Sequence, residues 1–236
     1  MNEPLVFLPE MMCDARMFWP QILEFGLTRA VMVAPVTGAS SVGAIAAQVL
    51  DAAPSRFALV GASMGGVIAM EVLRRAPERV TRVALMDTSP LPESPQVAAG
   101  REPQIVAVRA GRLGGLVREE IGPAALAHGP HRGEILNLLV EMAETLGPDI
   151  IVAQSRALQR RPDQQKILRT MRVPALVLCG EHDKVCPVKR HEFMAELIPY
   201  SDFQIIPNAG HFPTLEQPEA TSAALATWLD SPLVLR

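Results

Sequence analysis

Nucleophilic attack on a carbonyl carbon is the chemistry that three widely separated side chains of this sequence could perform: Ser63, Asp183 and His211. Ser63 lies in the segment GASMG (61–65), which fits the Gly-x-Ser-x-Gly pattern of a sharp strand-to-helix turn. Because a serine hydroxyl is a poor nucleophile at neutral pH, it needs a general base, and that base needs an acid to orient it. His211 is the candidate base and Asp183 the candidate acid.

Short apolar segments rich in Val, Leu and Ile recur along the chain and predict strands that are buried on both faces, because they lack alternation. Helical patterns at 41–52, 64–75 and 188–197 lie between them. Alternation of strand and helix predicts right-handed crossovers and a parallel sheet, and therefore an α/β fold. The predicted strands are 5–8, 30–34, 57–60, 83–86, 175–179 and 203–206.

The three candidate residues each follow a different predicted strand. In a parallel sheet these strand ends share one edge, so the sequence predicts that the three side chains meet there. The rhythm of strands stops between residues 90 and 171, where helical stretches are separated by Gly-Pro pairs. This segment predicts a helical cap over the same edge, inserted in a core made of residues 1–89 and 172–236.

Length, composition and charge limit the classes of protein to which this chain can belong. A chain of 236 residues that is 49% hydrophobic and 20% charged can form one sizeable core. The net charge of −3 and the lack of Lys/Arg blocks argue against nucleic acid or a membrane as partner. Three scattered cysteines, Cys13, Cys179 and Cys186, favour a reducing compartment over a disulfide framework, so we expect a cytoplasmic protein.

The chain resembles the α/β-hydrolase fold superfamily over nearly all of its length. The resemblance implies about six strands, nearly all parallel, without the first hairpin of that family. The order serine, aspartate, histidine is also the order of the family. The matching segments are PLVFLPEMMCDARMFW (4–19), GASMGG (61–66), VALMDTSP (83–90), VPALVLCGEHDKVCP (173–187) and NAGHFPTLEQP (208–218).

Two backbone N–H groups are expected to stabilise the oxyanion that forms during the reaction. Met64 supplies one, because it begins the helix that follows Ser63. The resemblance implies Met11 as the second donor. In that family a glycine precedes the second donor, whereas this chain has Glu10. We expect the Glu10 carboxylate to point outward, so that Glu10→Gly leaves the rate within about tenfold or raises it.

The residues and the resemblance together predict a carboxylesterase-type serine hydrolase. Its substrate is expected to be a small carboxylic ester or thioester, cleaved through an acyl-enzyme without a cofactor or a metal. The same three side chains also serve C–C bond hydrolases, lactonases, perhydrolases and the eliminase of menaquinone synthesis, which share this fold. A catalytically inactive ligand-binding protein is a further alternative, for which Glu10 is the main support.

Several other polar residues have competing interpretations. Asp87 also ends a strand and occupies the acid position of some superfamily members, although a turn or helix cap is its simpler role. Asp14 is expected to cap a short helix at 16–19. Two groups, His182 with Asp183 and Cys186, and His128 with His131, contain too few ligands for a metal site. The arginines of the insertion are expected on a solvated face, or in one or two cases beside an anionic substrate: Arg101, Arg109, Arg112, Arg156, Arg160 and Arg161.

Overall fold

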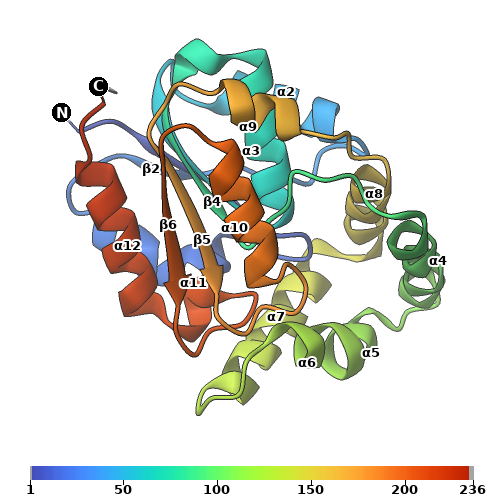
Figure 1. Cartoon of the computed structure of the whole chain (residues 1–236). Helices are drawn as coiled ribbons and strands as arrows, with labels where there is room; N and C mark the ends of the chain where they lie inside the picture. Colours follow the sequence, from blue (N-terminus) through green and yellow to red (C-terminus); the bar gives the residue numbers. More distant parts are fainter. Residues whose placement is uncertain (1, 234–236) are drawn as a thin grey trace.

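Six parallel strands form one sheet in the order β2-β1-β3-β4-β5-β6. The computed structural model describes residues 2–233 (Figure 1). Every neighbouring pair of strands is parallel, so the predicted sheet, which begins without a hairpin, is confirmed. The strands are β1 (Leu5–Leu8), β2 (Val31–Val33), β3 (Phe57–Ala62), β4 (Val80–Met86), β5 (Ala175–Gly180) and β6 (Ser201–Ile206).

Burial differs between the centre and the edges of the sheet. The four central strands are buried over their whole length. The edge strands β2 and β6 are partly exposed. The prediction that all six strands are buried on both faces is therefore correct for the centre and wrong for the edges, where each strand has a neighbour on one side only.

Helices cover both faces of the sheet (Figure 1). On one face α1 (Trp19–Phe25) packs against α12 (Pro218–Asp230), and on the other α2 (Val42–Ala52) packs against α3 (Met64–Arg75), with α10 (Val188–Leu197) against β5. Side-chain caps begin α2 and a short helix after β1, and the cap predicted at Asp14 is confirmed. The Ser41 hydroxyl accepts a hydrogen bond from Ala44 N–H at the start of α2, and Asp14 caps the short helix η1 (Ala15–Phe18).

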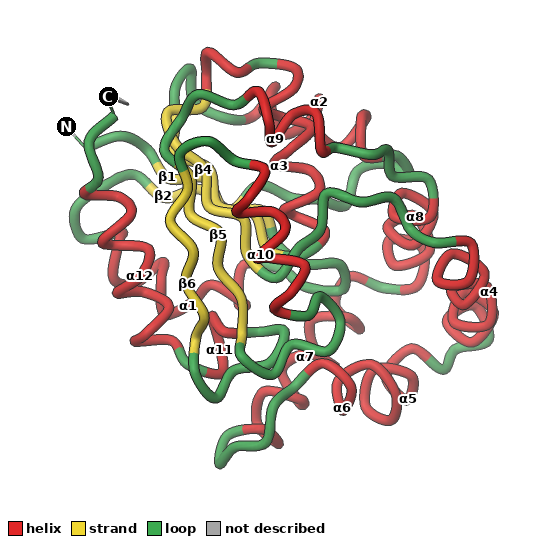
Figure 2. The backbone as a smooth tube through the Cα atoms, in the orientation of Figure 1, coloured by secondary structure: helices red, strands yellow, loops and turns green. Residues whose placement is uncertain are grey.

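A helical segment between β4 and β5 lies beyond the carboxyl ends of the strands (Figures 1 and 2). We call residues 90–171 the helical insertion; within it, strands are absent throughout. Its division from the core as a separate domain stays a prediction. It contains α4 (Pro95–Arg109), α5 (Leu113–Leu116), η3 (Val117–Ile121), α6 (Gly122–Ala125), α7 (Arg132–Leu146), α8 (Pro148–Gln159) and α9 (Gln165–Thr170). Before the chain enters β5, α9 packs against α3 and α10.

Two further sequence expectations concern buried cysteines and membrane spans. Cys13, Cys179 and Cys186 are all buried and form no disulfide. Burial raises the pKa of each thiol, so all three stay protonated at neutral pH. Among residues 2–233, none of the helices combines the length and apolar character that crossing a bilayer requires.

Candidate active site

Ser63 lies in a tight turn between β3 and α3, and its backbone has a φ of 49°. The glycines on either side are required by the close approach of backbone atoms. A Cβ atom at Gly65 would lie 2.0 Å from Leu8 O, and one at Gly61 would lie 2.4 Å from Gly65 O. Ser63 N–H donates to Met86 O over 2.8 Å. The Gly-x-Ser-x-Gly segment therefore holds the serine at the carboxyl edge of the sheet, as its pattern predicts.

The imidazole of His211 lies between Ser63 and Asp183. Its Nε2 is 2.9 Å from Ser63 Oγ, and its Nδ1 is 2.8 Å from Asp183 Oδ2. A carboxylate oxygen can only accept, so Nδ1 carries a hydrogen, and in the neutral ring Nε2 is free to accept the serine proton. Both His211 and Asp183 are buried. The structure thus brings together the three side chains singled out from the sequence.

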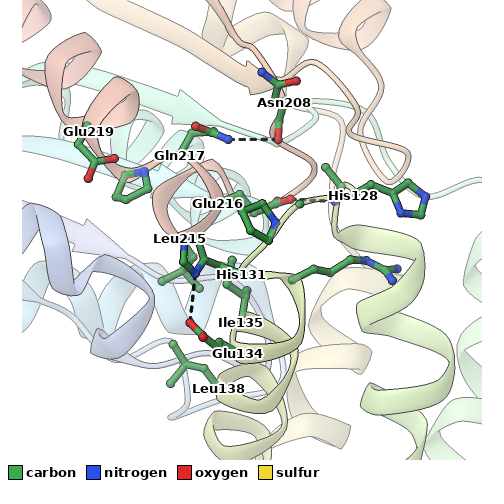
Figure 3. A pocket seen from close by; sticks show the side chains of 15 residues that line it. His128, His131, Glu134, Ile135, Leu138, Asn208, Leu215, Glu216, Gln217 and Glu219 are labelled. Carbon is green, nitrogen blue, oxygen red and sulfur yellow. Dashed lines mark hydrogen bonds and ion pairs between the residues drawn. The ribbon is translucent and has the colours of Figure 1, made fainter.

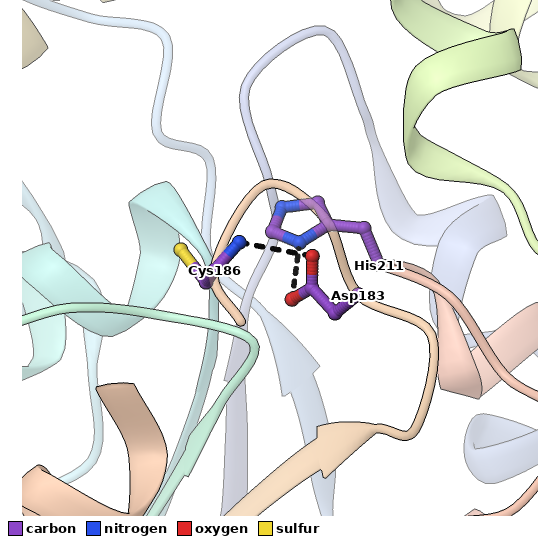
Figure 4. Close-up of side chains that lie close together, drawn as sticks. All are labelled: Asp183, Cys186 and His211. Atoms are coloured by element: carbon purple, nitrogen blue, oxygen red, sulfur yellow. Dashed lines mark hydrogen bonds and ion pairs between the residues drawn. The ribbon is translucent and has the colours of Figure 1, made fainter. Parts of the chain in front are cut away.

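Asp183 has a full set of hydrogen-bond partners (Figure 4). In addition to His211, which contacts Oδ2, the N–H groups of Val185 and Cys186 donate to Oδ1 over 2.8 and 2.9 Å. Two backbone donors and an imidazole stabilise the ionised carboxylate and fix its direction. The geometry is that of an acid that orients a base.

Asp87, the rival acid, is buried at the end of β4 and points toward β5. Its Oδ1 accepts from Gly180 N–H over 2.9 Å, while its Oδ2 has no partner among the described residues. Burial, reinforced by the charge of Asp183, raises the pKa of Asp87 well above its ordinary value. Asp87 is therefore a buried link between two strands, which differs from the turn or cap expected from the sequence.

The charge state of His211 is set by its neighbours. Burial alone would lower the pKa of the imidazole, but the charge of Asp183 and the hydrogen bonds to Asp183 and Glu10 outweigh it. The pKa of His211 is raised well above its ordinary value. This shift favours the protonated ring, whereas the ring must be neutral to act as a base.

Glu10 points into the site, so the prediction of an outward carboxylate is wrong. Its Oε2 lies 3.3 Å from His211 Nε2, and its side chain is 12% exposed. The loop after β1 turns back on itself, with Cys13 N–H donating to Glu10 O and Glu10 N–H donating to Met17 Sδ. The positive imidazole compensates for the buried charge that this turn directs inward. Glu10 and Ser63 therefore share one ring nitrogen.

Replacement Glu10→Gln is expected to move the acidic limb of the kcat/KM profile to lower pH. Activity requires neutral His211, so it rises as pH increases through the His211 pKa. Removing one of the carboxylates that raise this pKa lowers it, and the limb follows. The profile is measured with a neutral p-nitrophenyl ester. Glu24→Gln, on an exposed part of α1, is the control; a Glu10→Gln limb that coincides with the control would contradict the prediction.

The two expected oxyanion donors are available. Met64 is the first residue of α3, and neither its N–H nor that of Met11 donates to another group within residues 2–233. The next amide along the loop, Met12 N–H, donates to Gln154 Oε1 over 3.0 Å, and Gln154 Nε2 donates to Val36 O over 3.3 Å. Gln154, from α8, thus supports a loop in which Met12 has a φ of 64°. The roles of Met11 and Met64 stay predictions.

Glu216 holds the histidine loop, and the analysis of the sequence missed it. Its Oε1 accepts from the N–H groups of Gly210 and Phe212, each over 3.0 Å, and its Oε2 accepts from Ala127 N–H over 2.7 Å. His211 N–H donates to Ala125 O over 2.8 Å. One carboxylate therefore connects the loop of the candidate base to the helical insertion. The only signal in the sequence is its place in the segment NAGHFPTLEQP.

Glu216→Gln is expected to lower kcat/KM by about tenfold, because the amide NH₂ would face one of three N–H donors and leave it unpartnered. The imidazole should also lose its fixed position in this variant. The NMR signals of the His211 ring should therefore broaden more with temperature than they do in the wild type. Glu219→Gln, an exposed residue on the same cavity wall, is the matched control. Equal activity of the two variants would show that the three bonds do not position the base.

The cavity beside Glu216 does not reach the candidate nucleophile. It has a volume of about 550 Å³ and lies between the histidine loop and the insertion (Figure 3). His131 and Glu134, 3.2 Å apart, lie on its wall, and Ser63 is not among its lining residues.

Metal-binding side chains also meet at the candidate triad. Ligand atoms of Asp183, Cys186 and His211 lie within 4.8 Å of one another (Figure 4). The first and third are already hydrogen-bonded to each other, and burial raises the pKa of the Cys186 thiol to about 12. His182 is half-exposed, lies 3.8 Å from Glu181 and does not belong to this group. The arrangement is explained by the hydrogen bonds alone.

Comparisons with known proteins identify the family and the fold. The family described as "Alpha/beta hydrolase family" matches residues 25–224. An esterase from Thermogutta terrifontis, solved with malate bound, is 28% identical with a TM-score of 0.88, over 97% of this chain and 90% of that one. An enol-lactonase from Burkholderia xenovorans LB400 is 22% identical, with a TM-score of 0.85 over 98% and 93%. A bromoperoxidase from Bacillus anthracis is 16% identical, with a TM-score of 0.83 over 98% and 93%. A search of curated sequences found no match. The chain belongs to the alpha/beta hydrolase family.

Proposed function

We propose that this protein hydrolyses a small carboxylic ester or thioester through an acyl-enzyme intermediate on Ser63. The observation that carries the proposal is the position of the His211 ring, 2.9 Å from Ser63 Oγ and 2.8 Å from Asp183 Oδ2. A hydroxyl, an imidazole and a carboxylate in this order form the arrangement that activates serine for acyl transfer.

In the first half of the reaction, neutral His211 takes the proton of Ser63 as Oγ attacks the carbonyl carbon. The negative oxygen of the tetrahedral intermediate lies toward the N–H groups of Met11 and Met64. The C–O or C–S bond then breaks, and His211 transfers its proton to the leaving alcohol or thiol. Asp183 holds the ring orientation and stabilises the imidazolium throughout.

In the second half, water replaces the leaving group. His211 takes a proton from the water as its oxygen attacks the acyl-enzyme, and then returns a proton to Ser63 Oγ as the carboxylic acid departs. Glu10 remains beside Nε2 in both halves and favours the protonated ring. Its charge opposes the start of each half-reaction and favours the imidazolium that forms within it.

The alternative reactions keep the same three side chains. The neighbours named as an enol-lactonase and a bromoperoxidase are less than 25% identical, so they support the fold without selecting a reaction. The esterase from Thermogutta terrifontis is 28% identical, and this favours ester hydrolysis over the other reactions.

The proposal is tested with a fluorophosphonate probe and a panel of p-nitrophenyl esters, acyl thioesters and lactones. We expect covalent labelling at Ser63, located by mass spectrometry of peptides, and turnover of esters or thioesters. Labelling at another residue would refute the assignment of the nucleophile. A folded protein that turns over none of these substrates would instead favour a ligand-binding role.

A further inference from the structure

A group of charged side chains comes mainly from the helical insertion and contacts the loops on either side of the turn that carries Ser63. We call Glu93, Arg101, Arg161 and Arg190 the arginine cluster. The side chains of the first three are only 1%, 16% and 13% exposed. Arg101 and Arg161 are therefore mostly buried, and they do not lie on the solvated face that is the default expectation for the arginines of the insertion.

The cluster contacts loops on both sides of the candidate nucleophile. Arg101 Nη1 lies 3.4 Å from the Sδ atom of Met11, in the loop after β1, while Glu93 belongs to the segment after β4. Strand β3, which leads to Ser63, lies between β1 and β4 in the sheet. Arg190 contacts Ser89 in that same segment after β4, so the cluster reaches the loops on both sides of the strand that leads to Ser63.

Positive charge exceeds negative charge in the cluster. Arg101 takes both oxygens of Glu93, with three contacts of 2.6 to 3.0 Å. Arg161 Nη1 is 3.9 Å from the same carboxylate, beyond hydrogen-bond distance, and its Nε donates to Leu91 O. Arg190 has a single contact of 3.5 Å, to Ser89 Oγ, and no ion pair within residues 2–233. Three guanidinium groups against one carboxylate leave two positive charges in excess.

The excess charge lies close to the turn that carries Ser63. Arg190 Nη1 is 3.5 Å from Ser89 Oγ, and the hydroxyl of the adjacent Thr88 donates to Ser63 O over 2.7 Å. Arg161 Nη1 is 3.9 Å from the carboxylate that also binds Arg101, and Arg101 in turn contacts Met11. The nearby carboxylates of Asp183 and Glu10 are bonded to His211, and they do not form ion pairs with the cluster.

Burying the Arg161 guanidinium without a hydrogen-bonded acidic partner costs free energy, which a bound anion would offset. A planar guanidinium with free N–H groups matches a carboxylate, because two parallel hydrogen bonds can form. We propose that the substrate of this site carries a carboxylate in addition to its scissile ester or thioester, and that Arg161 and Arg190 bind it. This inference rests on the proposed function and names the substrate class of the same site.

The test compares the mono-p-nitrophenyl ester of adipic acid with its neutral analogue, in which the distal carboxylate is a methyl ester. The wild-type kcat/KM is expected to be at least about tenfold higher for the anionic ester, the lower end for a hydrogen bond between charged groups. Arg190→Gln and Arg161→Gln should each reduce this ratio by about tenfold. Lys189→Gln removes the same charge from the exposed neighbour of Arg190 and should leave the ratio unchanged.

Arg190→Gln carries the test if Arg161→Gln fails to fold, because Arg190 is half-exposed and makes no ion pair. Adipate binding, measured by calorimetry on the whole protein, separates the two proposals. Binding that Arg190→Gln weakens about tenfold supports the anion site even if no ester is turned over, in which case only the proposed function fails. Ester hydrolysis without preference for the anionic ester, or without adipate binding, overturns the inference and leaves the proposed function standing.

Discussion

Ser63→Ala is expected to reduce hydrolysis of p-nitrophenyl esters to the background rate, a loss on the order of 10⁴-fold or more. The physical reason is that Ser63 Oγ is the atom within reach of His211 Nε2 that can form the acyl-enzyme. Alanine keeps the Cβ atom and the backbone of the turn, so folding should be retained. The measurement is kcat/KM together with circular dichroism and fluorophosphonate labelling.

Ser40→Ala is the matched control for this variant, because Ser40 is exposed and lies before α2, away from the site. It should retain wild-type activity and labelling. If Ser63→Ala kept more than about a tenth of the activity, another nucleophile would have to be sought. The proposed acyl-enzyme would then be wrong even though the fold would stand.

Asp183→Asn is expected to reduce kcat by about 10⁴-fold, as for a triad whose orienting acid becomes an amide. Asp183 Oδ1 accepts from two backbone N–H groups, so the asparagine oxygen should occupy that position. Its NH₂ group would then face His211 Nδ1 and favour the tautomer that carries the hydrogen on Nε2. That tautomer cannot accept the proton of Ser63.

Asp87→Asn provides the comparison, since Asp87 ends the neighbouring strand and is equally buried. An asparagine can still accept the hydrogen bond from Gly180 N–H, and burial already favours a neutral side chain there. We expect kcat to fall less than about tenfold. The opposite ranking of the two variants would make Asp87 the orienting acid.

The meeting of Ser63, Asp183 and His211 could be predicted because it follows from short-range signals. Each residue lies in the turn or loop that follows a strand, and parallel strands end at one edge. The tight turn around Ser63 is likewise local, since its two glycines are required by contacts within a few residues and with β1. These features need no knowledge of how distant side chains pack.

The features that could not be predicted depend on contacts between distant segments. Met12 and Gln154 are 142 residues apart, and Ala127 and Glu216 are 89 apart. The direction of Glu10 depends on how its loop turns and on the charge of His211, which the sequence alone does not reveal. Arg101 and Arg156 both lie in the insertion and both bind a glutamate, yet only the partner of Arg101 is buried.

The three hydrogen bonds accepted by Glu216 couple the position of α6, in the helical insertion, to the position of the candidate base His211. The same carboxylate contacts the amides on both sides of His211 and the amide that follows α6. If these bonds stay intact, a displacement of α6 carries the imidazole away from Ser63. If α6 moves alone, Glu216 Oε2 loses the N–H group of Ala127 as its partner. The position of the imidazole relative to Ser63 therefore depends on where α6 lies.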